Sequence, residues 1–165
     1  MKKIKLFDPF TNESEKNAIK QIFDSHFWAS GEGVGKVQKF EEKFSKYTSS
    51  KSCVAVNSGT AALNLALSMY NIKNKEVIIP SLSFVSTANA VIENGGIPKF
   101  VDIDKNTLCM DPEKILKAIS KKTKVVLPVH FGGLTSNLGE ISKLCKENKI
   151  SLVEDAAHAA GSLHQ

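Results

Sequence analysis

Hydrophobic residues recur at helical spacing through the first fifty positions of the chain. Between Ser14 and about Phe27 they return every three or four residues, which predicts a helix with one apolar stripe. That stripe consists of Ala18, Ile19, Ile22 and Phe23. A glycine-rich stretch, WASGEGVGK, follows, and helical spacing resumes over Val37–Tyr47. The pattern predicts two helices joined by a loop.

From Cys53 onward, short runs of valine, isoleucine and leucine alternate with helical stretches. The runs predict strands at Cys53–Val56, Glu76–Ile79, Lys99–Val101, Thr123–Val129 and Ile150–Val153. The stretches between them predict helices at Thr60–Tyr70, Ser86–Glu93, Pro112–Ser120 and Leu138–Glu147. This alternation is typical of an α/β fold with a mostly parallel sheet covered by helices on both faces. Ligands of such sheets bind beyond the carboxyl ends of the strands.

The first predicted strand runs into VNSGTAALNLAL, where Ser58, Gly59 and Thr60 form a polar turn that opens a helix. Unpaired N–H groups and the helix dipole favour an anion at such a turn. Gly59 allows close approach and the two hydroxyls can donate, so the turn could hold a phosphate. Taken alone, the motif is more typical of a serine or threonine N-cap without a ligand.

An aromatic ring and an imidazole follow two further strands. Phe84 in PSLSFVSTANAV lies just past Pro80 in a polar surround, where it could stack on a flat ligand. The motif alone is more typical of a core phenylalanine. His130 in PVHFGG precedes two glycines. It is placed either to contact a substrate or to hydrogen-bond within its own loop.

The last predicted strand ends in VEDAAHAAG. Asp155 in this motif could neutralise a cationic ring nitrogen, or it could cap a short helix. His158 lies three residues later, so a helical turn would put both side chains on one side. The earlier GEGVGK is not interpreted as a phosphate loop, because it follows a helix and lacks the P-loop spacing and the preceding strand.

Composition narrows the class of protein. The 165 residues are 42% hydrophobic and 24% charged, which is typical of a soluble globular domain or part of a larger one. The net charge of +5 comes from dispersed lysines without any arginine, which argues against nucleic-acid binding. Three scattered cysteines give no disulfide framework and no metal-ligand spacing, so a cytoplasmic protein without a metal is expected. Neither a signal peptide nor a membrane span is predicted.

Together, the motifs place a phosphate cradle, an aromatic ring and a carboxylate at the carboxyl ends of one parallel sheet. A flat, phosphorylated ring with a nitrogen atom would use all three, and pyridoxal 5'-phosphate is such a molecule. The order and spacing of the motifs resemble the DegT/DnrJ/EryC1/StrS family of pyridoxal-phosphate sugar aminotransferases over essentially the whole chain. The resemblance rests on Trp28 with GEGV and FEEKF, and on VNSGTAALNLAL, EVIIPSLSFVSTANAV, GGIPKFVDID, KTKVVLPVHFGG and VEDAAHAAG.

The resemblance implies roles for individual residues. The residues that it implies for the phosphate grip are Ser58, Gly59 and Thr60. It puts Phe84 against the pyridine ring, Asp155 at the ring nitrogen and His158 close to the ring hydroxyl. Trp28 and the glycines after it are implied to form a loop near the substrate pocket.

The resemblance also implies the reaction and the fold. In the family a lysine holds the cofactor as a Schiff base and moves protons. An amino donor, commonly glutamate, leaves its amine on the cofactor, and a keto group on a nucleotide-linked sugar receives that amine. The implied fold is the large domain of the aspartate-aminotransferase-like fold type I, in a homodimer. A role in surface polysaccharide synthesis is expected.

The Schiff-base lysine of the family is expected beyond the EDAA motif, and no lysine of this chain matches it. Residues 1–165 are therefore expected to be an amino-terminal arm and part of the large domain, without the C-terminal small domain, and to be inactive alone. The resemblance implies a seven-stranded sheet whose first strand pairs with its last, so Cys53–Val56 would lack its neighbour. Two alternatives stay open: a sugar dehydratase of the same family, and a non-catalytic domain that binds the cofactor.

Overall fold

The computed structural model describes residues 8–28 and 35–163, which form two compact units that divide after Ala55. The first unit contains α1 (Glu13–Asp24) and α2 (Lys36–Tyr47), and both helices confirm the prediction from helical spacing. Asn12 begins α1 in a capping box, since its side chain accepts from the N–H of Ser14 and its own N–H donates to Glu15. The loop predicted near the substrate pocket begins at Trp28, which is described, but its residues 29–34 lie outside the described residues.

The predicted strand Cys53–Val56 is wrong. These residues have no strand structure, and Val54 and Val56 are 69% and 40% exposed. A strand is held by hydrogen bonds to a neighbouring strand, and none of the described strands pairs with this run. The N–H of Ala55 donates instead to the Glu41 side chain at 2.8 Å. A β-branched composition alone therefore does not produce a strand here.

The second unit is built on a four-stranded sheet in the order β2-β1-β3-β4, with every pair parallel. The strands are β1 (Glu76–Pro80), β2 (Ile97–Val101), β3 (Thr123–Val126) and β4 (Ser151–Leu152). The sequence predicts all four, although β3 and β4 are shorter than predicted. Pro128 has no N–H to continue the ladder of β3, and beyond it a single bridge joins Val129 to Asp155. Pro98 is tolerated in β2 because that strand lies at the edge of the sheet.

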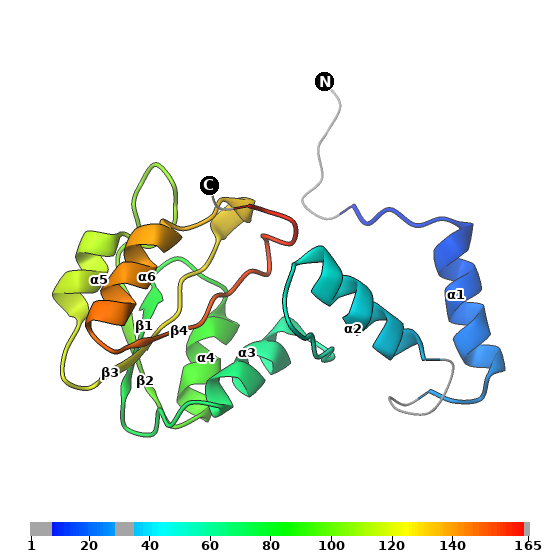
Figure 1. Cartoon of the computed structure of the whole chain (residues 1–165), viewed down its shortest axis with the longest axis horizontal. Helices are drawn as coiled ribbons and strands as arrows, with labels where there is room; N and C mark the ends of the chain where they lie inside the picture. The colour runs from blue at the N-terminus through cyan, green and yellow to red at the C-terminus, as the bar shows by residue number, and fades with distance from the viewer. Residues whose placement is uncertain (1–7, 29–34, 164–165) are drawn as a thin grey trace. The chain divides into compact units, whose positions relative to one another are not determined.

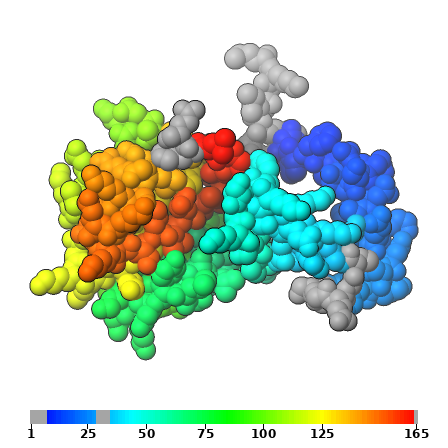
Figure 2. Space-filling model, viewed as in Figure 1, coloured from blue at the N-terminus to red at the C-terminus, as the bar shows by residue number. Residues whose placement is uncertain are grey.

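Helices cover both faces of this sheet (Figure 1). They are α3 (Gly59–Ser68), α4 (Val85–Glu93), α5 (Pro112–Ala118) and α6 (Leu138–Glu147), and a 3₁₀ turn, η1, spans Phe131–Gly133. Within β1 the side chains of Val77 and Ile79 join the core under α3 and α4, and Ile78 joins the core under α5 and α6. The surface of α6 appears in orange in Figure 2. The predicted α/β class, with helices on both faces of a parallel sheet, is confirmed.

Glu76 ties three strands together at the amino end of the sheet. Its carboxylate accepts from Ser120 Oγ at 2.6 Å and from Lys99 Nζ and Thr123 Oγ1 at 3.1 Å. The hydrogen bond from Ser120 lowers the pKa of Glu76 most. Partial burial opposes that change, and Lys99 and Thr123 lower the pKa further. This polar cluster lies at the edge of the sheet opposite the carboxyl ends.

The lowered pKa of Glu76 predicts a pH-dependent stability. Ionised Glu76 stabilises the fold above the pKa of an unfolded carboxyl, near 4.5, and this stabilisation is lost as the pH falls through the lower folded pKa. We expect the difference in unfolding free energy between the wild type and Glu76→Gln to be largest above pH 5 and to shrink in acid. Urea unfolding at several pH values measures it. A difference that does not change with pH would contradict the assignment.

Candidate functional site

The carboxyl ends of β3 and β4 are joined by backbone hydrogen bonds at the candidate site. The N–H of Asp155 donates to Pro128 O at 2.9 Å, and the N–H of His130 donates to Asp155 O at 3.1 Å. These two bonds flank the bridge between Val129 and Asp155. They hold the backbone of Asp155 at the edge where ligands of parallel sheets bind.

The carboxylate of Asp155 is buried, with 9% of the residue exposed, and each of its oxygens accepts a hydrogen bond. Thr87 Oγ1 donates to Oδ2 at 3.1 Å, and the N–H of Ala157 donates to Oδ1 at 3.2 Å. Two donors hold the side chain in one orientation. A buried, oriented carboxylate of this kind is suited to pair with a cationic group of a ligand.

Phe84 stands at the start of α4, at the end of the short loop that follows β1. It is the N-cap residue, and the N–H of Thr87 donates to Phe84 O at 3.0 Å. The Phe84 residue is 75% exposed, whereas Thr87 is fully buried. The interpretation of Phe84 as a core residue is therefore wrong. One helical turn carries an exposed ring and the hydroxyl that contacts Asp155.

Ser58, Gly59 and Thr60 form the first turn of α3, as predicted. Ser58 is the N-cap, and its Oγ accepts from the N–H of Ala61 at 3.1 Å. The three predicted residues are exposed, and a Cβ added at Gly59 would meet no atom within 4 Å. Because α3 leads into the amino end of β1, its own amino end faces the carboxyl edge of the sheet. The turn thus has the N-cap that the sequence predicts and also open space for an anion.

His158 lies on a series of turns that follows Asp155. The N–H of Ala159 donates to Ala156 O at 2.8 Å, and no helix forms among the described residues of this segment. His158 Nδ1 accepts from the N–H of Gly132 at 3.2 Å, and its ring meets Phe131 edge-on with centroids 5.7 Å apart. This hydrogen bond leaves Nε2 to carry the proton of the neutral ring. The exposed imidazole therefore has a donor available for a ligand.

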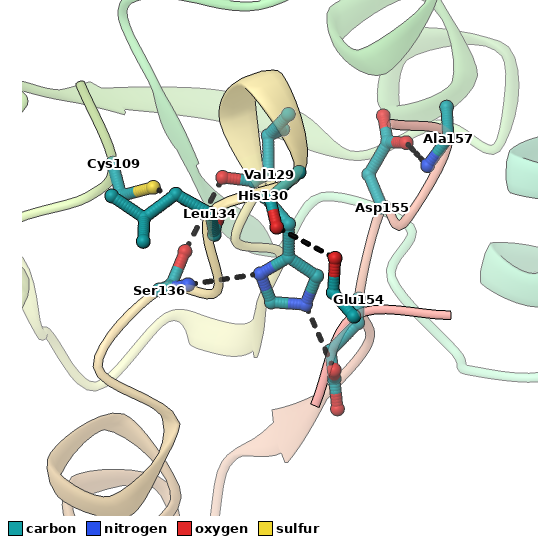
Figure 3. Close-up of polar contacts among 10 residues, drawn as sticks. Cys109, Val129, His130, Leu134, Ser136, Glu154, Asp155 and Ala157 are labelled. Atoms are coloured by element: carbon teal, nitrogen blue, oxygen red, sulfur yellow. Dashed lines mark hydrogen bonds and ion pairs between the residues drawn. The ribbon is translucent and has the colours of Figure 1, made fainter. Parts of the chain in front are cut away.

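His130 is buried in its own loop, as one of the two sequence interpretations expects. Its Nδ1 accepts from the N–H of Ser136 at 3.1 Å, so Nε2 carries the proton and donates to Glu154 Oε2 at 3.0 Å. Ser136 Oγ donates to Val129 O at 3.2 Å. Figure 3 shows the ring held between Ser136 and Glu154, beside Asp155. The substrate-contact interpretation does not fit a residue that is 3% exposed.

The sequence interpretation missed the contact of Thr87 with Asp155. It gave Thr87 no partner. One signal was present, because Thr87 follows Phe84 by three positions at the start of a predicted helix, where a hydroxyl faces inward from the same turn. The partner, Asp155, lies 68 positions away along the chain, and that pairing depends on tertiary packing.

Comparison with known proteins identifies the family. The model of the DegT/DnrJ/EryC1/StrS aminotransferase family matches residues 9–165. The chain belongs to this family. Among curated proteins, the spore coat polysaccharide biosynthesis protein SpsC of Bacillus subtilis strain 168 is 41% identical over 152 residues, which are 92% of the chain and 38% of SpsC. The family member described here thus spans about two fifths of the length of that relative.

Solved structures agree with this family and confirm the fold. The chain matches 3-amino-5-hydroxybenzoic acid synthase with a TM-score of 0.88 at 32% identity, over 93% of the chain and 40% of the synthase. It matches GDP-4-keto-6-deoxymannose-3-dehydratase, crystallised with a trapped PLP-glutamate geminal diamine, with a TM-score of 0.86 at 32% identity, over 95% of the chain and 42% of the dehydratase. The parallel sheet with its helices is therefore part of the fold type I architecture. None of the helices in the described ranges of this family member is long and apolar enough to cross a membrane.

Proposed function

We propose that this chain is the amino-terminal part of a pyridoxal-phosphate-dependent aminotransferase. The proposed enzyme transfers an amino group, from glutamate, to a keto group of a nucleotide-linked sugar for surface polysaccharide synthesis. The observation that carries the proposal is the buried carboxylate of Asp155 at the carboxyl edge of the sheet, which accepts two hydrogen bonds. Family membership supports the reaction, and the name of SpsC supports a polysaccharide product. We further propose that the protein is a cytoplasmic homodimer.

The residues present fit the cofactor chemically. Its phosphate group needs donors and space, and the turn at Gly59 offers N–H groups at a helix start and an open approach. Its flat ring needs an exposed aromatic face, which Phe84 supplies. Its ring nitrogen needs a carboxylate, which Asp155 supplies. We therefore propose that these residues, with Ser58, Thr60 and His158, hold pyridoxal 5'-phosphate.

Each of these residues has a defined task in the proposed mechanism. The bound cofactor supplies an electron sink for the carbon that loses or gains the amine. Asp155 holds a proton at the ring nitrogen, which keeps that sink effective. His158 would donate from Nε2 to the ring hydroxyl, and Phe84 would keep water from one face of the ring. Ser58 and Thr60 would hold the phosphate group of the cofactor at the start of α3.

The lysine that family members use has no match in these 165 residues. We propose that this segment contributes cofactor contacts but does not transaminate by itself. We also propose that the lysine belongs to the remainder of the enzyme. A dehydratase is the second candidate function, because one matched structure is a sugar dehydratase that holds PLP. The residue in the position of that lysine discriminates the two, since a histidine there would favour dehydration.

To test the proposal, the whole reading frame is expressed to its stop codon. The purified protein is then given pyridoxal phosphate, glutamate and a panel of nucleotide-linked keto-sugars. We expect 2-oxoglutarate and an amino sugar in equal amounts, detected by mass spectrometry. Loss of a hydroxyl from the sugar without a gain of nitrogen would favour the dehydratase. If the protein binds the cofactor and consumes neither glutamate nor any keto-sugar, it is a non-catalytic binding domain.

A further inference from the structure

A directed chain of hydroxyl groups ends at the Asp155 carboxylate. Thr87 Oγ1 lies 3.1 Å from Asp155 Oδ2 and 2.6 Å from Ser83 Oγ. A hydroxyl has one proton, and an ionised carboxylate only accepts. The Thr87 hydroxyl therefore donates a hydrogen bond to Asp155 and accepts one from the hydroxyl of Ser83. The direction of the chain, from Ser83 through Thr87 to Asp155, follows from this proton count.

These hydrogen-bonded hydroxyl groups couple Asp155 to the ring of Phe84. Thr87 and Phe84 belong to one turn at the start of α4, since the N–H of Thr87 donates to Phe84 O. Thr87 is fully buried, so water does not compete for its hydroxyl. Any shift of that turn moves the exposed ring of Phe84 and the donor to Asp155 together.

We propose that Thr87 is a positioning residue for the cofactor's ring nitrogen, which it controls by orienting the carboxylate of Asp155. This inference rests on the proposed function, because it takes Asp155 as the partner of that nitrogen. Thr87 and the N–H of Ala157 each bind one carboxylate oxygen, which leaves a single orientation for the carboxylate plane. Without Thr87 the side chain can rotate about its last bond, and the nitrogen loses a fixed partner.

The experiment compares Thr87→Val, which removes the hydroxyl at nearly constant volume, with Thr87→Ser, which retains it. Equilibrium dialysis measures the dissociation constant of pyridoxal phosphate, and the ¹⁵N chemical shift of the labelled cofactor reports the protonation of its ring nitrogen. For Thr87→Val we expect about tenfold weaker binding, since a hydrogen bond to a charged group is lost. We also expect the ¹⁵N shift to move toward that of an unprotonated ring. Thr87→Ser keeps both values close to the wild type.

A matched control separates positioning from general stability. Thr123 Oγ1 also donates to a carboxylate, Glu76 Oε2 at 3.1 Å, but at the opposite edge of the sheet. Thr123→Val is expected to leave the dissociation constant and the ¹⁵N shift unchanged. If Thr87→Val does not fold, Ser83→Ala replaces it, because it removes the donor to Thr87 from a side chain that is not fully buried. Its expected effect is about threefold in the same direction.

The outcomes distinguish this inference from the function on which it rests. If the wild type does not bind pyridoxal phosphate, or if Asp155→Asn leaves the ¹⁵N shift unchanged, the proposed function fails. If Asp155→Asn moves the ¹⁵N shift but Thr87→Val does not, only the inference about Thr87 is overturned. The same holds for Ser83→Ala where it replaces Thr87→Val. Weaker binding that Thr87→Ser does not restore would also overturn it, since the hydroxyl would then not be the cause.

Discussion

Replacing Asp155 by asparagine is expected to lower the turnover number of the proposed aminotransferase by about 10²- to 10³-fold, the range for losing one preorganised electrostatic partner. Asparagine has nearly the shape of aspartate, and its oxygen can still accept from Thr87. It carries no charge, so it cannot hold a proton at the ring nitrogen of the cofactor. Steady-state kinetics on the protein from the whole reading frame measures the loss.

Asp104 offers a matched control for this substitution. Its Oδ1 accepts from the N–H of Asn106 at 2.9 Å, which is the same bond to a residue two positions later that Asp155 makes with Ala157. Asp104→Asn is expected to leave the turnover number unchanged, because Asp104 lies in the loop after β2 and not in the site. An Asp155→Asn variant with wild-type turnover would remove Asp155 from the proposed mechanism.

The sequence predicts the sheet of the second unit because burial there is periodic and local. In β1, Ile78 faces one core while its neighbours Val77 and Ile79 face the other, and a doubly covered strand of this kind appears as an unbroken apolar run. Cys53–Val56 shows the limit of such an argument. Its composition suits a strand, but a strand also needs a neighbour to accept its hydrogen bonds, and composition does not report one.

The candidate site likewise has features that the sequence predicts and features that it does not. The backbone positions of Phe84 and Asp155 follow from the rule that parallel strands end at one edge, so the sequence could place them. The side-chain partners follow from packing between distant segments. Thr87 reaches Asp155 across 68 positions, and the ring orientation of His130 depends on Ser136 and Glu154, which lie in two different loops. No local pattern encodes those contacts.

The second large effect is expected on stability, from His130→Ala. The ring is 3% exposed, and its removal leaves a cavity between the ends of β3 and β4. It also removes the acceptor for the N–H of Ser136, a residue that is 1% exposed, so a buried donor loses its partner. Loss of the hydrogen bond to Glu154 adds little, because the Glu154 side chain is 43% exposed and water solvates it. We expect the unfolding free energy to fall by about 3 kcal/mol.

Urea unfolding of the purified chain measures this loss, and Ser136→Ala is its control. That substitution removes the bond from Ser136 Oγ to Val129 O but keeps the N–H that His130 accepts, so its expected cost is about 1 kcal/mol. Hydrogen exchange adds a local measure, since the amide of Ser136 should lose protection in His130→Ala and keep it in Ser136→Ala. Equal costs for the two variants would mean that the imidazole fills space without satisfying the buried amide.

The N–H of His130 that donates to Asp155 O belongs to the backbone and survives either change, so the folded fraction of His130→Ala should bind pyridoxal phosphate close to normally. A large loss of binding by that fraction would instead make the imidazole part of the cofactor site.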